Sequence, residues 1–308
     1  MNYSKINNLA GWVTFLIASI TYILTLEPST SFWDCGEFIA AAFKLQVVHQ
    51  PGAPLFLMVQ KMFSLLAFGD TAKIAYFMNV GSALCSGLTI LFLFWTITAL
   101  AKKVVAKPNE ELSNGQLISI IGSGLVGALA YTFSDSFWFS AVESEVYAMS
   151  SLCTAIVFWA ILKWEAQANE PGADRWIIFI AYVMGLSIGV HLLNLLVIPA
   201  IALVYYFKRN ENATPKGTIL ALITGIAILG VIQYGVIQYL IKLAANFDLF
   251  FVNSLGFGFG SGVLVFALLL IGAIVYGIQY SIRKNKTILN LGLLCFTFIL
   301  LGYSSFAM

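Results

Sequence analysis

The residues of this sequence best suited to catalysis lie in one stretch, Phe32 to Leu55, directly after the first long apolar run. Asp34 and Glu37 are three residues apart, so on a helix both carboxylates share a face and can point into one cavity. A carboxylate with apolar surroundings has a raised pKa, which suits a general base. The spacing therefore predicts a catalytic role for this pair. The structural alternative is that Asp34 caps a helix beginning at Gly36 or Glu37.

A histidine and a lysine accompany the acidic pair. His49 precedes Pro51, Gly52 and Pro54, which predict a rigid corner between two helices. A histidine at a membrane surface can hold a phosphate or a sugar hydroxyl, and Lys44 is a second candidate for that task. The alternatives are a purely structural corner and a lysine that extends to lipid headgroups.

Two more carboxylates and a second histidine occur later in the chain. Glu143, Glu145 and Tyr147 are candidates for binding substrate. Ser140 and Glu143 also match a capping box, which is the structural alternative for Glu143. Glu145, followed by Tyr147, falls in the predicted outer turn of a span, where an acid normally faces a cavity because burying its charge in lipid is unfavourable. His191 lies in a tight turn between two predicted spans, where it either binds substrate or satisfies backbone groups.

The elements that must position these residues are membrane helices. Sixty per cent of the residues are apolar and ten per cent are charged, against roughly a quarter charged in soluble domains. This composition predicts an all-α polytopic membrane protein. Nine runs are long enough to span; they lie near residues 9–26, 76–101, 116–133, 141–163, 175–190, 192–207, 217–241, 262–282 and 288–306.

Composition also excludes some functions. The net charge of +2 provides no general basic patch, so nucleic acid is not an expected partner. The four cysteines are far apart, with no CxxC pair, so neither a disulfide framework nor a zinc site is predicted.

The apolar run Pro54 to Phe68 decides the topology. At 1.5 Å per residue it reaches about 22 Å, short of a bilayer core of about 30 Å. Gln60, Lys61 and Ser64 share one helical face, so we expect an interfacial helix. Together with residues 32–55, this run makes the first outer loop a platform of interfacial helices.

With that run lying flat and a cytoplasmic N-terminus, twelve of the sixteen basic residues face the cytoplasm, as the positive-inside rule requires. They are Lys5, Lys102, Lys103, Lys107, Lys163, Arg175, Lys208, Arg209, Lys216, Arg283, Lys284 and Lys286. A spanning 54–68 segment would move eleven of them outside. The flat arrangement places the acidic candidates and both histidines at the outer face. Residues 1–308 are predicted to form one transmembrane domain, and the uncharged C-terminal end suggests a chain whose continuation is missing.

An inside N-terminus, one span and an acidic outer loop with interfacial helices resemble the C superfamily of glycosyltransferases, the GT-C fold. The strings SFWDCGEFIAAA (31–42), HQPGAPLF (49–56), AVESEVY (141–147) and GVH (189–191) resemble a bacterial membrane family typical of Bacteroidetes. Its vertebrate relative is a transmembrane protein O-mannosyltransferase acting on plexin-type receptors. Family members usually continue into a soluble outer domain, and we expect residues 1–308 to contain only the transmembrane domain.

The resemblance implies an inverting transfer of a sugar, mannose, from a polyprenyl-phosphate donor. The acceptor is a Ser or Thr hydroxyl of an exported protein, and the site faces the periplasm from the inner membrane. In that scheme Asp34 deprotonates the acceptor, while Glu37 and Glu145 orient sugar or acceptor. His49, Lys44 or His191 neutralises the phosphate leaving group. No cofactor is assigned, and a divalent metal is left open because superfamily members differ in using one.

Two other functions compete with this prediction. A transporter or flippase of a lipid-linked sugar would bind substrate with the same acids, but the sequence shows no inverted repeats and no acids at mid-membrane. A structural subunit of an envelope assembly would use the carboxylates only to cap helices.

Overall fold

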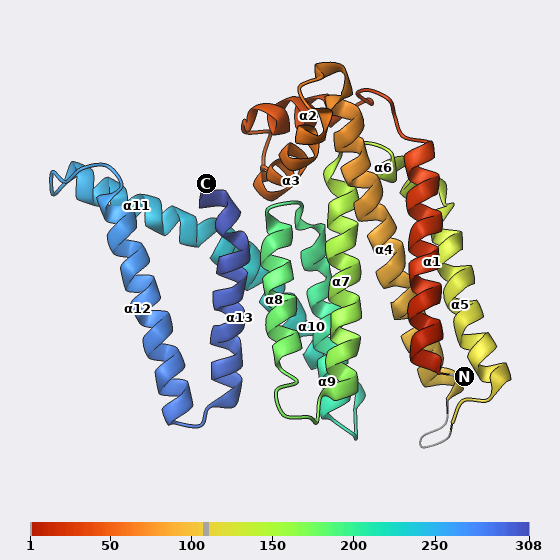
Figure 1. Ribbon diagram of the computed structural model, residues 1–308. Coiled ribbons are helices and arrows are strands. Elements are labelled where there is room, and N and C mark those ends of the chain that lie inside the picture. The colour runs from red at the N-terminus through yellow and green to blue at the C-terminus, as the bar shows by residue number, and fades with distance from the viewer. Residues whose placement is uncertain (1, 107–110, 308) are drawn as a thin grey trace. The chain divides into compact units, whose positions relative to one another are not determined.

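The computed structural model describes residues 2–106 and 111–307, and Lys107 of the predicted cytoplasmic set lies outside them. The described residues form helices and connecting loops and contain no strand (Figure 1). Eight helical segments within them are long and apolar enough to cross a membrane. The predicted span 175–190 is a shorter apolar helix, α8. The prediction of an all-α polytopic membrane protein is confirmed.

The helices are as follows: α1 Tyr3–Leu24, α2 Cys35–Lys44, α3 Pro54–Ser64, η1 Leu65–Ala67, η2 Thr71–Lys73, α4 Ile74–Val105, α5 Asn114–Thr132, α6 Asp135–Ala141, α7 Val146–Gln167, α8 Arg175–Ile188, η3 Leu192–Val197, α9 Ile198–Arg209, α10 Pro215–Gly230, the π-helical η4 Val231–Leu240, α11 Ile241–Asn253, α12 Ser261–Arg283, α13 Thr287–Tyr303 and η5 Ser304–Ala307.

The chain divides into two compact units. The first comprises Met1–Lys163, Val183–Asn194 and Gly302–Met308, and the second comprises Trp164–Tyr182 and Leu195–Leu301. The candidate residues all belong to the first unit.

The scaffold of the first unit is the bundle of α1, α4 and α5. Small residues let these helices approach closely, as is common between membrane helices. A Cβ added at Gly87 of α4 would clash with Ser19 of α1, and one at Gly124 of α5 would lie 2.7 Å from Phe94 Cε2. Gly124 and Gly127 of the GxGxxG string at residues 122–127 therefore serve helix packing in α5.

The α2–α3 cap (residues 34–67) packs against one end of α4 (Figure 1). Gln60 and Ser64 are buried, and Gln60 Nε2 donates to Ser82 Oγ of α4 at 3.3 Å. Met62 and Leu65 are exposed instead. The polar face expected to meet water therefore meets protein, and the surface that α3 and η1 leave open is apolar.

The second unit consists mainly of helical hairpins. α9 packs along α10, and α11 along α12. Asp248 of α11 is buried and accepts hydrogen bonds from the backbone N–H groups of Gly260 and Gly262 at 3.1 and 2.9 Å, which satisfies donors at the start of α12. This carboxylate has a structural role.

Candidate active site

Asp34 occupies the N-cap position of α2, but its carboxylate makes no side-chain capping hydrogen bond. The helix is held at this end by the backbone, with Phe38 N–H donating to the Asp34 carbonyl at 2.9 Å. Trp33, the preceding residue, has a φ of 62°, which is rare for an aromatic residue and clusters with functional sites in proteins. Asp34 is thus at the N-cap position, as the capping alternative expected, but its side chain does not cap the helix.

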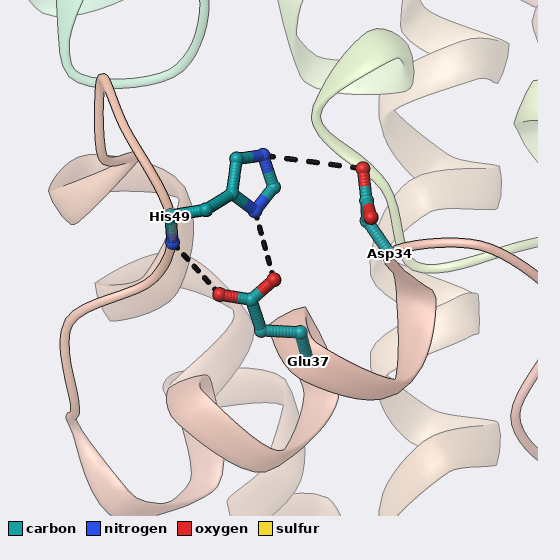
Figure 2. Close-up of side chains that lie close together, drawn as sticks. All are labelled: Asp34, Glu37 and His49. Carbon is teal, nitrogen blue, oxygen red and sulfur yellow. Dashed lines mark hydrogen bonds and ion pairs between the residues drawn. The ribbon is translucent and has the colours of Figure 1, made fainter.

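Glu37 binds His49 through both of its carboxylate oxygens (Figure 2). Oε1 accepts the backbone N–H of His49 at 2.7 Å, and Oε2 lies 2.8 Å from Nδ1 of the ring. The other ring nitrogen, Nε2, lies 3.9 Å from Asp34 Oδ2. Asp34 and Glu37 therefore share a face at the start of α2, as predicted. The turn at residue 49 places the His49 imidazole between these two carboxylates.

Local sequence explains how His49 reaches that place. Leu45 ends α2 in the left-handed conformation, and the chain then turns at residues 49–52, where Gly52 N–H donates to the His49 carbonyl at 2.9 Å. Gly52 has a φ of 80°, a conformation that favours glycine. The ring of His49 rests 5.6 Å from that of Phe38, which is buried in the α2–α3 cap.

The loop between α6 and α7 differs from the sequence prediction. The capping box is wrong, because Ser140 lies inside α6 and its hydroxyl donates to the Ser136 carbonyl. Glu143 and Glu145 both precede α7, which begins at Val146. The two acids therefore belong to a tight loop, in which Glu145 N–H donates to the Glu143 carbonyl at 3.0 Å.

This loop lies against the start of α2. Glu143 and Glu145 are 4% and 7% exposed. Glu143 is close enough to the Cys35 thiol to interact with it, and Glu145 is close enough to Asp34 and His49 to interact electrostatically with both. The structure thus brings carboxylates from the start of α2 and from the α6–α7 loop close to one imidazole.

The charges shift the proton affinities of the site in opposite directions. The hydrogen bond between Glu37 and His49 raises the pKa of His49 and lowers the pKa of Glu37. The raised pKa expected for the Glu37 carboxylate is therefore wrong. Burial, then the charges of Glu143 and Asp34, raise the pKa of Glu145 to about 7. Glu145 is therefore the acid that changes its charge near neutral pH.

Tyr147 and His191 form a second pair beside this loop, with ring centroids 5.4 Å apart. His191 Nδ1 accepts the backbone N–H of Leu193 at 3.1 Å, which leaves Nε2–H as the donor of the neutral ring. Burial lowers the pKa of His191, which favours that neutral form.

The turn holding His191 is tied to the α2–α3 cap. The Gly189 carbonyl accepts the backbone N–H groups of Leu55 and Phe56 at 2.9 and 3.2 Å. Lys44 is not brought to the cluster, because it is the last residue of α2. At 1.5 Å per residue, the opposite end of that ten-residue helix is about 15 Å from Asp34.

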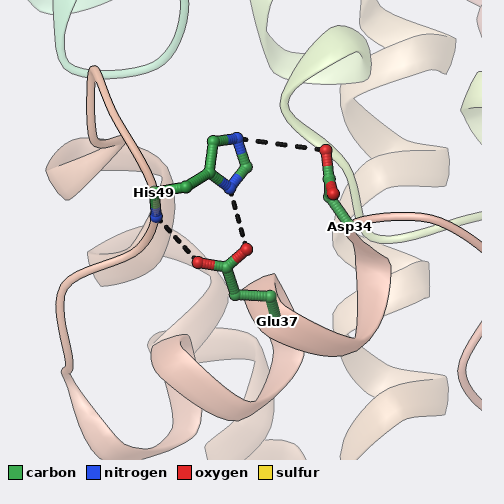
Figure 3. A network of polar contacts seen from close by, with 3 residues as sticks. All are labelled: Asp34, Glu37 and His49. Atoms are coloured by element: carbon green, nitrogen blue, oxygen red, sulfur yellow. Dashed lines mark hydrogen bonds and ion pairs between the residues drawn. The ribbon is translucent and has the colours of Figure 1, made fainter.

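Asp34, Glu37 and His49 could hold a metal ion. One ligand atom from each lies within 4.8 Å of the others (Figure 3). Carboxylate oxygens with one imidazole suit Mn²⁺ or Zn²⁺ among common cations. The side chains are also roughly half exposed, so a substrate can reach them.

Sequence reasoning missed Asn79 of α4 as a residue that supports the site. Its amide is 1% exposed and donates to the carbonyls of Glu27 and Ser29 at 2.8 and 3.1 Å. These bonds fix the segment that leads into Asp34. The available signal was an amide side chain within an apolar span, which normally has a partner.

Residues 34–214, more than half of the chain, match the model of the protein O-mannosyl-transferase TMEM260 N-terminal domain. Protein O-mannosyl-transferase tmem260 of Dictyostelium discoideum is 26% identical over 47% of this chain and 16% of its own length. Protein O-mannosyl-transferase TMEM260 of Mus musculus is 25% identical over 56% of this chain and 22% of its own length.

The matched regions are thus less than a quarter of these two relatives. No solved structure matches the chain. The match begins at Asp34 and includes the α2–α3 cap, the Glu143–Glu145 loop and His191, which confirms the resemblance predicted from those strings. The chain belongs to the family of the protein O-mannosyl-transferase TMEM260 N-terminal domain.

Proposed function

We propose that this protein is a membrane glycosyltransferase that moves mannose from a polyprenyl-phosphate donor to a Ser or Thr hydroxyl of an exported protein. The names of the two relatives support mannosyl transfer to protein. The observation that carries the proposal is the cluster of Asp34, Glu37 and His49, with Glu145 beside it, on a scaffold of membrane-spanning helices.

The reaction needs a base for the acceptor. The Asp34 carboxylate is half exposed and is not used as a helix cap, so it can take the acceptor hydroxyl proton. The acceptor oxygen then bonds to C1 of the sugar as the bond from C1 to the phosphate oxygen breaks. Attack from the face opposite the leaving group inverts C1, and polyprenyl phosphate departs with the bonding electrons.

The leaving phosphate needs donors or positive charge. His49 has a raised pKa, and Glu37 fixes its ring. His191 presents Nε2–H beside Tyr147. Lys44 has no part in this scheme because it lies at the far end of α2.

The buried acids orient the sugar. Glu145, with a pKa of about 7, can donate a hydrogen bond when protonated and accept one when ionised. Glu143 supports this loop through its contact with the Cys35 thiol.

The site faces the periplasm in this proposal, with the N-terminus in the cytoplasm of a bacterial cell and the chain in its inner membrane. Most basic residues then lie on the cytoplasmic side, as the positive-inside rule requires. The α2–α3 cap and the Glu143–Glu145 loop share the opposite side.

The test uses the purified chain in proteoliposomes with radiolabelled polyprenyl-phosphate mannose and total envelope protein. The proposal expects label on protein, lost in an Asp34→Asn variant and released by chemical cleavage of O-glycosidic bonds. Movement of intact donor across the vesicle membrane without transfer would instead identify a transporter.

A further inference from the structure

A cavity of about 470 Å³ lies within the first unit, among α4, α5 and α7. Its size is within the range of small-molecule sites, about 300–1,000 Å³. Leu93, Tyr131 and Phe158 contribute one wall each from the three helices. All three helices are long and apolar enough to span a membrane, so the cavity can be filled from the lipid phase.

The lining favours an apolar chain over a polar ligand. No charged side chain lines the cavity within the described part of the protein. Two of its hydroxyls are turned toward their own helices, since Thr89 Oγ1 donates to the Cys85 carbonyl at 2.9 Å and Thr154 Oγ1 to the Ser150 carbonyl at 3.1 Å. These two threonines thereby satisfy their polar groups without a ligand, whereas the hydroxyl of Thr96, also in the lining, is buried without a hydrogen-bond partner.

One helical stripe connects the cavity with the candidate active site. Tyr147, Ser151, Thr154 and Phe158 all line the cavity, and their spacing places them along one face of α7. Tyr147 is at the start of this stripe, two residues after Glu145, and its ring contacts His191. The cavity therefore begins where the polar site ends and follows α7 into the membrane.

We propose that this cavity binds the isoprenoid chain of the lipid-linked donor, next to the site that binds its phosphate and sugar. The inference rests on the proposed function for the identity of the lipid. It adds a binding site formed by α4, α5 and α7 to the polar residues that perform the transfer. A chain held here points away from the carboxylates while its head remains beside Tyr147 and His191.

The test blocks the cavity with one large side chain. Ala155 lines it and is half-buried, so Ala155→Phe fills space without entering the core. Ala130→Phe is the matched control, because Ala130 is exposed on α5 and does not line the cavity. The probe is undecaprenyl phosphate carrying a diazirine within its chain, added to the purified protein in nanodiscs.

We expect photolabelling of wild-type α7 and of Ala130→Phe, and a loss of roughly tenfold in labelling for Ala155→Phe, as for a blocked hydrophobic pocket. Equal labelling of all three proteins would overturn the proposal. So would equal displacement of the probe by phosphatidylglycerol and by unlabelled undecaprenyl phosphate, because the cavity would then hold ordinary membrane lipid.

The labelling does not require sugar transfer, so the two proposals fail separately. Selective labelling in a wild-type protein that transfers no mannose would support lipid binding in the cavity and contradict the proposed mannosyl transfer. Mannosyl transfer by Ala155→Phe with an unchanged KM for the long-chain donor would support the proposed enzyme activity. It would contradict binding of the donor's chain in this cavity.

Discussion

Glu37 holds His49 at two points, the ring nitrogen Nδ1 at 2.8 Å and the backbone N–H at 2.7 Å. The carboxylate therefore fixes both the side chain and the turn from which it projects. It also leaves Nε2 facing Asp34, 3.9 Å from Oδ2. Glu37 thus serves as a positioning residue for the imidazole, a role that the i and i+3 spacing of the acids did not reveal.

NMR can test this relationship directly, since the chain contains two histidines. We expect the pKa of His49 above the ordinary value of about 6.5 and that of His191 below it. Glu37→Gln removes the charged partner and should bring the pKa of His49 down while leaving that of His191 unchanged. A His49 titration that is the same in wild type and variant would show that the pair does not form in solution.

Asp34→Asn should abolish transfer without reducing expression. Loss of a general base typically costs about 10²–10⁴-fold in rate, and the carboxylate makes no capping bond whose loss would weaken α2. Activity is measured as mannose transferred per mole of purified protein.

The matched control for that change is Asp70→Asn. Asp70 is also an aspartate in a loop near the cap, but its side chain pairs with Lys73 at 3.1 Å and caps η2. It should retain transfer. Wild-type rates in Asp34→Asn would remove the base assignment, and equal losses in both variants would indicate damage to the outer loops instead.

The sequence predicted the membrane class and the Asp34–Glu37 face because apolar runs and helical spacing are local properties. Gly52 likewise marked its turn, since a positive φ favours glycine. The bond between Glu37 and His49 joins residues twelve apart through that turn. The identity of the residues alone did not show which carboxylate the imidazole would meet.

The loop of Glu143 and Glu145 shows why other features were not predictable. A capping box describes local geometry at the start of a helix. Here Ser140 lies near the end of α6, which stops at Ala141, so Ser140 and Glu143 do not begin a helix. The contact of Glu143 with Cys35 joins two distant loops. Similarly, Gln60 and Ser64 marked a polar face correctly, but only the packing of α3 on α4 decided that this face is buried.

Glu145 should make stability depend on pH. Its pKa rises from 4.5 unfolded to about 7 folded, so the folded state binds the proton more tightly and loses stability as pH rises through that window. The loss is at most about 3 kcal/mol. His49, with a raised pKa, acts in the same direction. Glu145→Gln should flatten the dependence of Tm on pH between 5 and 8.

Thermal unfolding in detergent, followed across that pH range, measures the effect. Glu165→Gln is a suitable control, because Glu165 is at the other end of α7 and pairs with Lys208 at 3.9 Å. Because the lowered pKa of His191 acts in the opposite direction, the test is the difference in Tm between wild type and Glu145→Gln. A difference that does not change from pH 5 to 8 would contradict the raised pKa of Glu145.

Gly52→Ala should weaken the site through the backbone alone. A Cβ at this position would lie 3.7 Å from the Phe306 ring, an ordinary contact, so the cost comes from the φ of 80° and is roughly 1–2 kcal/mol. Because Gly52 closes the turn on the His49 carbonyl, we expect the pKa of His49 to fall and transfer to slow as well as Tm to drop.

Gly122→Ala in α5 is the control, since a Cβ there meets nothing within 4 Å and alanine favours the helix. Loss of Tm in Gly52→Ala with an unchanged His49 titration would show that the turn stabilises the cap without positioning the imidazole.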